Sequence, residues 1–158
     1  NAVTITLRNS DFQVETNSRH DEWMKVAQWL IANGKVPIFV PDAEADMRGR
    51  NKPIPFPTYF AASYNFALKL ALYEKAQLNL FTVGGVSAMA MLSDVPVMAF
   101  KFEVPGSSDP LYHRPQLIAA GFSPEHDWST PKHRTQIFWE DDTAENVIPI
   151  LEKHFKGA

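Results

Sequence analysis

Two adjacent glycines and the residues around them, near the middle of the chain, are suited to hold a ligand. The apolar run before them, Leu78 to Thr82, is typical of a buried strand. Gly84 and Gly85 then predict a tight turn that lets a ligand approach the backbone closely. Val86 and Ser87 begin a helix whose first amides point at the same place. Because open α/β sheets bind ligands at the carboxyl ends of strands, this segment predicts a site for an anionic small molecule, with a nucleotide or nucleotide sugar favoured.

Polar side chains also follow the first two predicted strands. Arg8, Asn9 and Ser10 come directly after the first strand, and Asp42 comes after the second. A guanidinium there can neutralise a diphosphate through forked hydrogen bonds, and an acid after the second strand can accept hydrogen bonds from a ribose. These residues are therefore expected at the same edge of the sheet as the glycine turn.

Purely structural roles are the alternatives for these residues. The double glycine can serve packing alone, and Ser87 can cap the helix that it begins. Arg8 can form a surface ion pair with Asp11 or Glu15, and Asp42 can be a solvated acid. The sequence leaves these alternatives open.

No metal site or cofactor is predicted. The chain has no cysteine, and none of its five histidines pairs with another at a spacing typical of metal ligands. Asp141 and Asp142 are a possible acid pair for a metal, but they stand where the amino end of a helix favours negative charge. The helix explanation is the favoured one.

Composition limits the classes of partner. The chain has 158 residues, enough for one domain, with 45% hydrophobic and 21% charged residues. Its net charge of −3 gives no basic field, and its tryptophans are not interleaved with basic residues, so nucleic-acid binding is not expected. No apolar run is long enough to cross a bilayer and no signal peptide is visible, so a cytoplasmic protein without a transmembrane segment is expected.

Strands and helices alternate along the chain. This order predicts an α/β fold, a Rossmann-like parallel sheet with helices on both faces. Strands are expected over Val3–Leu7, Val36–Val40, Leu78–Thr82, Pro96–Phe100 and Gln136–Trp139. Helices are expected from a capping box at Ser18 and Asp21 to Gly34, and over Ala61–Ala76, Ala88–Leu92, Leu117–Ala120 and Thr143–Phe155. The segments Pro41–Thr58 and Lys101–Lys132 are expected to be long irregular connections.

The glycine-turn segment resembles a pattern in GT-B glycosyltransferases. In their carboxyl-terminal half, and most closely in the heptosyltransferase-like group, a strand ends in a glycine turn, followed by a small-residue helix and a proline-led strand. The gap from Gly85 to Pro96 is similar to the family's gap. Val83 and Gly84 stand where the family has an acidic residue and a serine, and Ala88 where it often has a histidine. A phosphate-binding role that needs only the backbone is unaffected by these departures.

The resemblance implies a function and a domain organisation. It implies that residues 1–158 are a single domain that binds the nucleotide diphosphate of a sugar donor without a metal. It also implies that Arg8 or its neighbours contact the diphosphate, and that Lys101 and Glu103 line the base or ribose. The start of the chain, with Asn1 directly before a strand, predicts a fragment of a two-domain protein whose missing amino-terminal domain supplies the general base.

Other functions fit the same pattern. A stand-alone module that binds a nucleotide or phosphorylated ligand without catalysis is the alternative. A sugar-nucleotide epimerase on the same two-domain plan is a third and weaker interpretation, because it needs acids and a histidine at the cleft that the sequence does not place.

Overall fold

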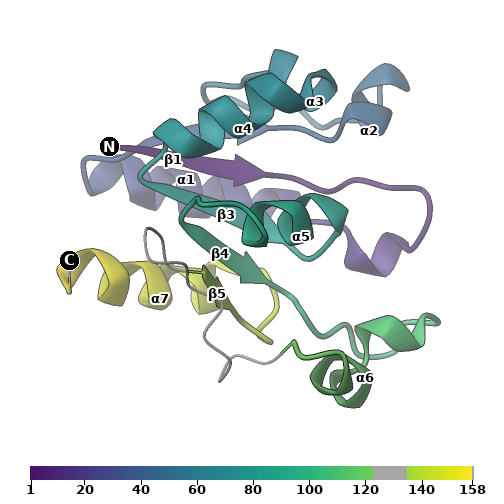
Figure 1. Cartoon of the computed structure of the whole chain (residues 1–158). Helices are drawn as coiled ribbons and strands as arrows, with labels where there is room; N and C mark the ends of the chain where they lie inside the picture. Colours follow the sequence, from purple (N-terminus) through teal and green to yellow (C-terminus); the bar gives the residue numbers. More distant parts are fainter. Residues whose placement is uncertain (123–134, 158) are drawn as a thin grey trace.

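The protein is built on one parallel β-sheet, seen in a computed structural model that describes residues 1–122 and 135–157 (Figure 1). The strand order is β2-β1-β3-β4-β5, and all neighbouring pairs are parallel. The strands are β1 (Ala2–Thr6), β2 (Val36–Val40), β3 (Leu78–Thr82), β4 (Val97–Phe100) and β5 (Thr135–Ile137). These bounds agree with the predicted strands to within two residues at each end. The predicted α/β, Rossmann-like fold is confirmed.

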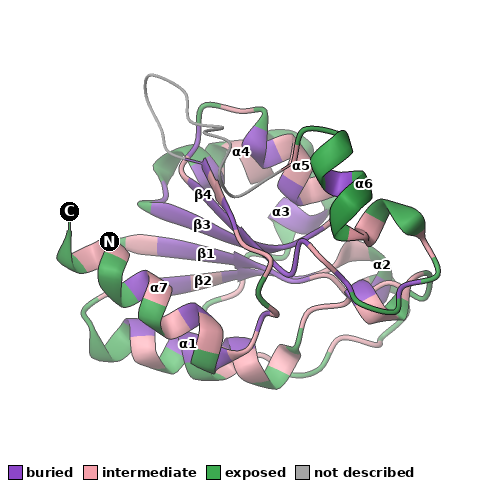
Figure 2. Ribbon diagram, turned by 90° about the horizontal axis from the view of Figure 1, so that it is seen from below, coloured by how far each residue is buried: buried purple, intermediate pink, exposed green. Residues whose placement is uncertain are grey.

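Helices cover both faces of the sheet (Figure 2). Those of the described residues are α1 (His20–Ala32), α2 (Ala43–Met47), α3 (Ala61–Tyr64), α4 (Phe66–Lys75), α5 (Gly85–Met91), α6 (Arg114–Ala119) and α7 (Ala144–Lys156), with short 3-10 turns η1 (Val14–Thr16) and η2 (Pro110–Tyr112). One face packs against α1 and α7, and the other against α3, α4, α5 and α6. Consecutive strand residues divide between the two cores: Leu80 joins the first and Phe81 the second. Both faces are buried, which explains the nearly continuous apolar runs of the strands.

The start of α1 differs from the expected one. The sequence predicts a capping box at Ser18 and Asp21, which is wrong: the N-cap residue is Arg19, and it makes no side-chain cap bond. The Ser18 hydroxyl instead accepts a hydrogen bond from the Arg8 amide at 2.8 Å and pairs with the Thr82 hydroxyl at 2.8 Å. Ser18 therefore links its own segment, before α1, to the loop after β1 and to the end of β3 at the carboxyl edge of the sheet, and it does not cap the helix.

The helix expected over Ala61–Ala76 is two helices. Asn65 separates them, because its backbone is extended (φ −122°, ψ 112°). Its side-chain oxygen accepts a hydrogen bond from the Leu68 amide at 3.0 Å and so caps α4. An asparagine side chain competes well with the helical backbone for such bonds, and this local chemistry overrides the helix propensity of the flanking residues.

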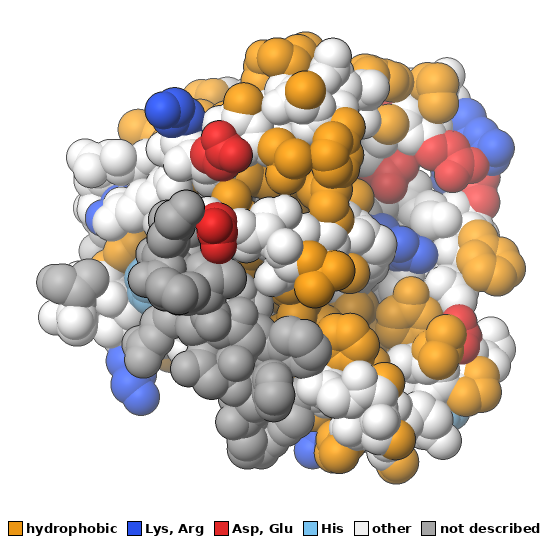
Figure 3. Space-filling view, in the orientation of Figure 1, with side chains coloured by type: hydrophobic (Ala, Val, Ile, Leu, Met, Phe, Trp, Pro, Cys, Tyr) orange, Lys and Arg blue, Asp and Glu red, His pale blue; other side chains and the backbone are white. Residues whose placement is uncertain are grey.

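The surface around α3 and α4 carries exposed apolar side chains. Phe60, Tyr64 and Phe66 are each at least half exposed, and apolar side chains gather on the face seen in Figure 3. Tyr73 anchors α4 from the other side: it is fully buried, and its hydroxyl lies 2.7 Å from that of Thr6. Burial raises the pKa of Tyr73 far above its ordinary value.

The two long connections contain short helices that the sequence pattern did not predict or only partly predicted. The first connection holds α2. The second holds η2 and an α6 that begins at Arg114, earlier than the expected Leu117. Residues 123–132 of the second connection lie outside the described residues. Thr143 caps α7, because its side chain accepts a hydrogen bond from the Asn146 amide, and α7 continues through Pro149.

Candidate ligand-binding site

The loops after β1 and β3 meet at the point where the sheet's connections diverge. In the strand order 2-1-3-4-5, the chain leaves β1 toward one face and β3 toward the other, which opens a crevice between their carboxyl ends. Thr6 of β1 lies opposite Phe81 of β3, so the two strands end level with each other. We call this place the β1–β3 crevice. It encloses about 60 Å³ and is lined by Thr6, Leu7, Arg8, Asp42, Phe81, Thr82, Gly84, Gly85, Val86 and Ser87.

Arg8 extends across the crevice to the glycine turn. A Cβ atom added to Gly84 would lie 3.1 Å from Nη1 of Arg8, so a larger residue there would press on the guanidinium. Gly84 itself has an extended backbone (φ 162°), so its lack of a side chain serves this close approach and not an unusual turn. The Arg8 Nε donates a hydrogen bond to the Thr16 hydroxyl at 2.7 Å, which fixes the direction of the guanidinium.

The surface ion pair considered for Arg8 is absent among the residues that the structure describes. Asp11 is bound instead by Arg48 and Arg50. Glu15 accepts a hydrogen bond from the Ser107 hydroxyl at 3.0 Å. The guanidinium therefore stands in the crevice without an ion pair in the described parts of the chain, and its nearest electrostatic effect is on Glu15, whose pKa its charge helps to lower.

The glycine turn presents backbone to the crevice. Ser87 is buried, and its hydroxyl accepts a hydrogen bond from the Gly84 amide at 3.0 Å and donates one to the Gly84 carbonyl at 2.7 Å. The Ser87 side chain thus fixes the turn at the start of α5, which agrees with the alternative that Ser87 serves as a helix cap. Gly85 is exposed, and a Cβ atom there would meet nothing within 4 Å. Gly85 and Val86 line the crevice, and as the first residues of α5 their amides have no acceptor within the helix.

The other residues expected at this edge are used structurally. Asp42 caps α2 by accepting from the Ala45 amide at 3.0 Å, and its second oxygen lies 3.4 Å from the Asn9 amide nitrogen. The Ser10 amide donates to the side chain of Asn17 at 2.8 Å. These contacts hold the loops that border the crevice in place.

Lys101 and Glu103 do not line the crevice. Glu103 forms an ion pair with Arg114. Lys101 is buried, and its ammonium donates to the Asn17 carbonyl at 2.9 Å. The loop that carries them does reach the site through Phe102, which lines the adjoining cavity.

A buried carboxylate at this edge is the feature that sequence reasoning missed. The side chain of Asp142 is fully buried, whereas the sequence pattern assigned it only a favourable place at the amino end of a helix. Burial raises the pKa of Asp142, although the charge of Lys101 opposes this effect. Burial also opposes ionisation of Asp141, but hydrogen bonds with Arg19 and Asp142 and the charges of Lys101 and Arg19 together lower the pKa of Asp141. The available signal was position: both acids follow the last strand, at the same edge as the glycine turn.

A mainly apolar cavity of about 360 Å³ adjoins the glycine turn. It shares Gly84, Gly85 and Ser87 with the crevice, and Phe102 and Tyr112 contribute aromatic surface. Its volume falls in the range of roughly 300–1,000 Å³ that is typical of small-molecule sites. A ligand whose phosphates lie at Arg8 therefore has room for a larger, less polar part on the other side of the turn.

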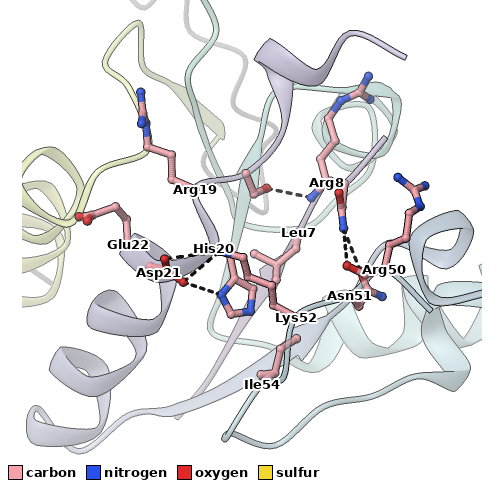
Figure 4. A pocket seen from close by; sticks show the side chains of 12 residues that line it. Leu7, Arg8, Arg19, His20, Asp21, Glu22, Arg50, Asn51, Lys52 and Ile54 are labelled. Carbon is pink, nitrogen blue, oxygen red and sulfur yellow. Dashed lines mark hydrogen bonds and ion pairs between the residues drawn. The ribbon is translucent and has the colours of Figure 1, made fainter. Parts of the chain in front are cut away.

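A second, polar cavity of about 470 Å³ lies between the start of α1 and residues 50–54 (Figure 4). The Asp21 carboxylate lies there between His20 and Lys52: its Oδ1 is 3.1 Å from Nδ1 of His20, and its Oδ2 is 3.4 Å from Nζ of Lys52. The guanidinium groups of Arg8 and Arg19 point away from His20, on opposite sides. Lys52 is thus paired with Asp21, whereas Arg50 pairs with Asp11 through Nη1 and keeps its Nε and Nη2 buried without a hydrogen-bond partner in the described part of the chain.

The described residues contain no cluster of three or more His, Asp or Glu side chains that could hold a metal ion. His126 and His133 lie outside the described residues. Within the described part of the chain, no helix is long and apolar enough to cross a membrane. Comparison with protein-family models, curated proteins and solved structures found no match for the chain.

Proposed function

We propose that the chain binds the diphosphate of a nucleotide sugar in the β1–β3 crevice, as the donor-binding half of a GT-B-like glycosyltransferase. One observation carries the proposal: the Arg8 guanidinium forms no ion pair among the described residues and lies so close to Gly84 that an added Cβ atom would press on it. A partly buried cation beside free backbone amides is the arrangement that binds phosphate oxygens. The apolar cavity beyond the turn is suited to the nucleoside.

The same arrangement can assist sugar transfer. When the bond between the sugar and the distal phosphate breaks, negative charge develops on the departing diphosphate. Arg8 and the amides of Gly85 and Val86 are placed to stabilise that charge, which lowers the barrier if the bonds strengthen in the transition state.

The base that activates an acceptor is not part of the crevice. Asp42 is the one carboxylate among the described residues that line it, and backbone amides occupy both its oxygens. A glycosyltransferase therefore needs a base from another domain. The same observation favours, as a second candidate, a module that binds a nucleotide without catalysis.

Calorimetric titration of the whole chain with UDP, GDP, ADP, CMP and their sugar conjugates tests the proposal. At least one diphosphate is expected to bind, and Arg8→Gln is expected to weaken it by about tenfold or more, since a charged hydrogen bond contributes roughly 1.5–3 kcal/mol. Arg48→Gln, which removes an exposed arginine paired with Asp11, is the matched control and should bind as the wild type does. Absence of binding by every diphosphate, or equal affinity of the Arg8 variant, would contradict the proposal.

The sugar conjugates separate the two candidates. A donor-binding half should bind a sugar nucleotide at least as tightly as the free diphosphate, because the sugar is part of its ligand. A regulatory module for free nucleotides should lose affinity when the terminal phosphate carries a sugar.

A further inference from the structure

A buried ion pair lies behind the β1–β3 crevice. The Lys101 ammonium nitrogen is 3.6 Å from Oδ1 of Asp142; the Asp142 side chain is fully buried and that of Lys101 is 10% exposed. Oδ1 of Asp142 has no hydrogen-bond partner, and its charge is offset by the Lys101 ammonium and, at 3.9 Å, by Nε of Arg19. Asp141 lies at 3.7 Å from the same ammonium nitrogen. Lys101 directly follows β4, and Asp142 lies in the segment before α7.

Lys101 also has an unusual backbone. Its φ of +57° lies in the left-handed region, which a residue with a side chain adopts at a cost in stability. Burying a pair of charges is costly as well, and apolar residues of similar volume are often at least as stable. The left-handed backbone of Lys101 and the buried Lys101–Asp142 pair both lower stability, and both lie next to the β1–β3 crevice. Their position points to a role beyond holding the fold together.

The pair is bonded to the end of the loop that carries Arg8. The Lys101 ammonium donates to the Asn17 carbonyl at 2.9 Å. Oδ2 of Asp142 accepts from the Arg19 amide at 2.9 Å, and also from the Trp23 indole at 2.9 Å. Residues on both sides of Ser18 are therefore fixed by the pair.

Ser18 connects this anchor to Arg8. Oδ2 of Asp142 accepts from the Thr82 hydroxyl at 3.1 Å, and that hydroxyl lies 2.8 Å from the Ser18 hydroxyl. The Ser18 hydroxyl accepts from the Arg8 amide at 2.8 Å, and the Ser18 amide donates to the Arg8 carbonyl at 2.9 Å. The Arg8 side chain is then directed by Thr16, which lies within the same loop.

We propose that Lys101 and Asp142 are positioning residues: they fix the loop from Arg8 to Arg19 and so hold the Arg8 guanidinium over Gly84, ready for a phosphate. The pair does not contact the ligand itself. This inference rests on the proposed function for its ligand, but its structural part, the anchoring of the loop, is testable without one.

The variant Lys101→Met/Asp142→Asn tests the inference. It removes both charges together, so neither is left buried alone, and methionine keeps a side chain on the left-handed backbone. Affinity for the diphosphate that the wild type binds is expected to fall by about tenfold. Val147→Ala, an apolar truncation in the core at α7, is the control for loss of stability alone and should bind normally.

Coupling to Arg8 separates positioning from a general structural role. If the pair acts through Arg8, then Arg8→Gln should weaken binding by about tenfold in the wild type but by less than about twofold in the double variant. Additive effects of the two changes, or wild-type affinity of the double variant, would overturn the inference. Ser18→Ala, which removes the hydroxyl that links Thr82 to the Arg8 amide and keeps Lys101 and Asp142, gives a second measurement should the double variant not fold, and should also be non-additive with Arg8→Gln.

Hydrogen exchange tests the anchoring without a ligand. Amides of residues 9–18 should exchange about tenfold faster in the double variant than in the wild type. In Val147→Ala, exchange of these amides should not increase more than exchange elsewhere in the chain. Unchanged exchange there would overturn the inference. Failure of the wild type to bind any diphosphate would overturn the proposed function instead, and leave the exchange result to decide on the loop.

Discussion

The direction of one guanidinium decides what the β1–β3 crevice can bind. Arg8 is held by a hydrogen bond from its Nε to Thr16, and it forms no ion pair in the described parts of the chain. A cation that is fixed in direction loses little freedom when it binds a phosphate, which favours affinity.

Thr16 should therefore matter for binding although it does not line the crevice. Thr16→Val removes the acceptor for the Arg8 Nε with little change in volume, whereas Thr16→Ser keeps the hydroxyl. We expect the valine variant to bind a nucleoside diphosphate about three- to tenfold more weakly, corresponding to roughly 1 kcal/mol, and the serine variant to bind as the wild type does. Calorimetry on both variants measures this, and equal affinities for the two would contradict the role of the hydroxyl.

Asp142 makes stability depend on pH. Because burial raises its pKa, the folded protein keeps this proton at a higher pH than the unfolded chain does. The wild type therefore loses stability through this group as the pH rises from about 4, the ordinary value, through the raised pKa. The unfolding temperature of Lys101→Met/Asp142→Asn relative to the wild type should rise over that interval.

Calorimetric melting between about pH 4 and pH 8 measures the difference. Val147→Ala removes no titratable group, so its difference from the wild type should not change with pH in the same way. If the unfolding temperature of the double variant instead falls relative to that of the wild type as the pH rises, the raised pKa of Asp142 is contradicted.

At the scale of elements, the hydrophobic pattern predicted the strands, which are determined by burial. It did not predict a helix break and a helix start that are determined by the hydrogen bonds of single side chains. The strands were predictable because both faces are buried. The break between α3 and α4 was not, because it depends on the bond from Leu68 to Asn65, which competes with a helical pattern that runs straight through it. Ser18 failed as a predicted cap for a related reason: its hydroxyl bonds to Arg8 and Thr82, which are distant in sequence.

The break in the helix leads to a prediction about stability. Asn65→Ala removes the cap of α4 and is expected to lower the free energy of unfolding by about 1 kcal/mol, or about 2–4 °C in melting temperature for a chain of this size. Thermal unfolding followed by circular dichroism measures it. Gln28→Ala, on the exposed face of α1, is the control and should change the melting temperature little. A melting temperature unchanged by Asn65→Ala would show that the cap contributes nothing.

For the whole molecule, strand order places the candidate site. Sequence alone predicted that Arg8 and Gly84 lie at one edge, because both follow parallel strands. It did not predict that β1 and β3 are neighbours, which brings the two residues into contact. Nor did it place Asp142 behind them, since that depends on how α1 and the segment before α7 pack together. Local pattern thus predicted the edge, and tertiary packing decided which residues form the site and which hold it.

Nuclear magnetic resonance of the ¹⁵N-labelled chain tests the central claim most directly, because it shows where a ligand binds. In a titration with UDP, GDP or ADP, the backbone amides of Arg8, Gly84, Gly85 and Val86 should show the largest shifts, and these should saturate together. Shifts confined to the polar cavity at the start of α1, or to the apolar surface of α3 and α4, with the glycine amides unmoved, would contradict the account.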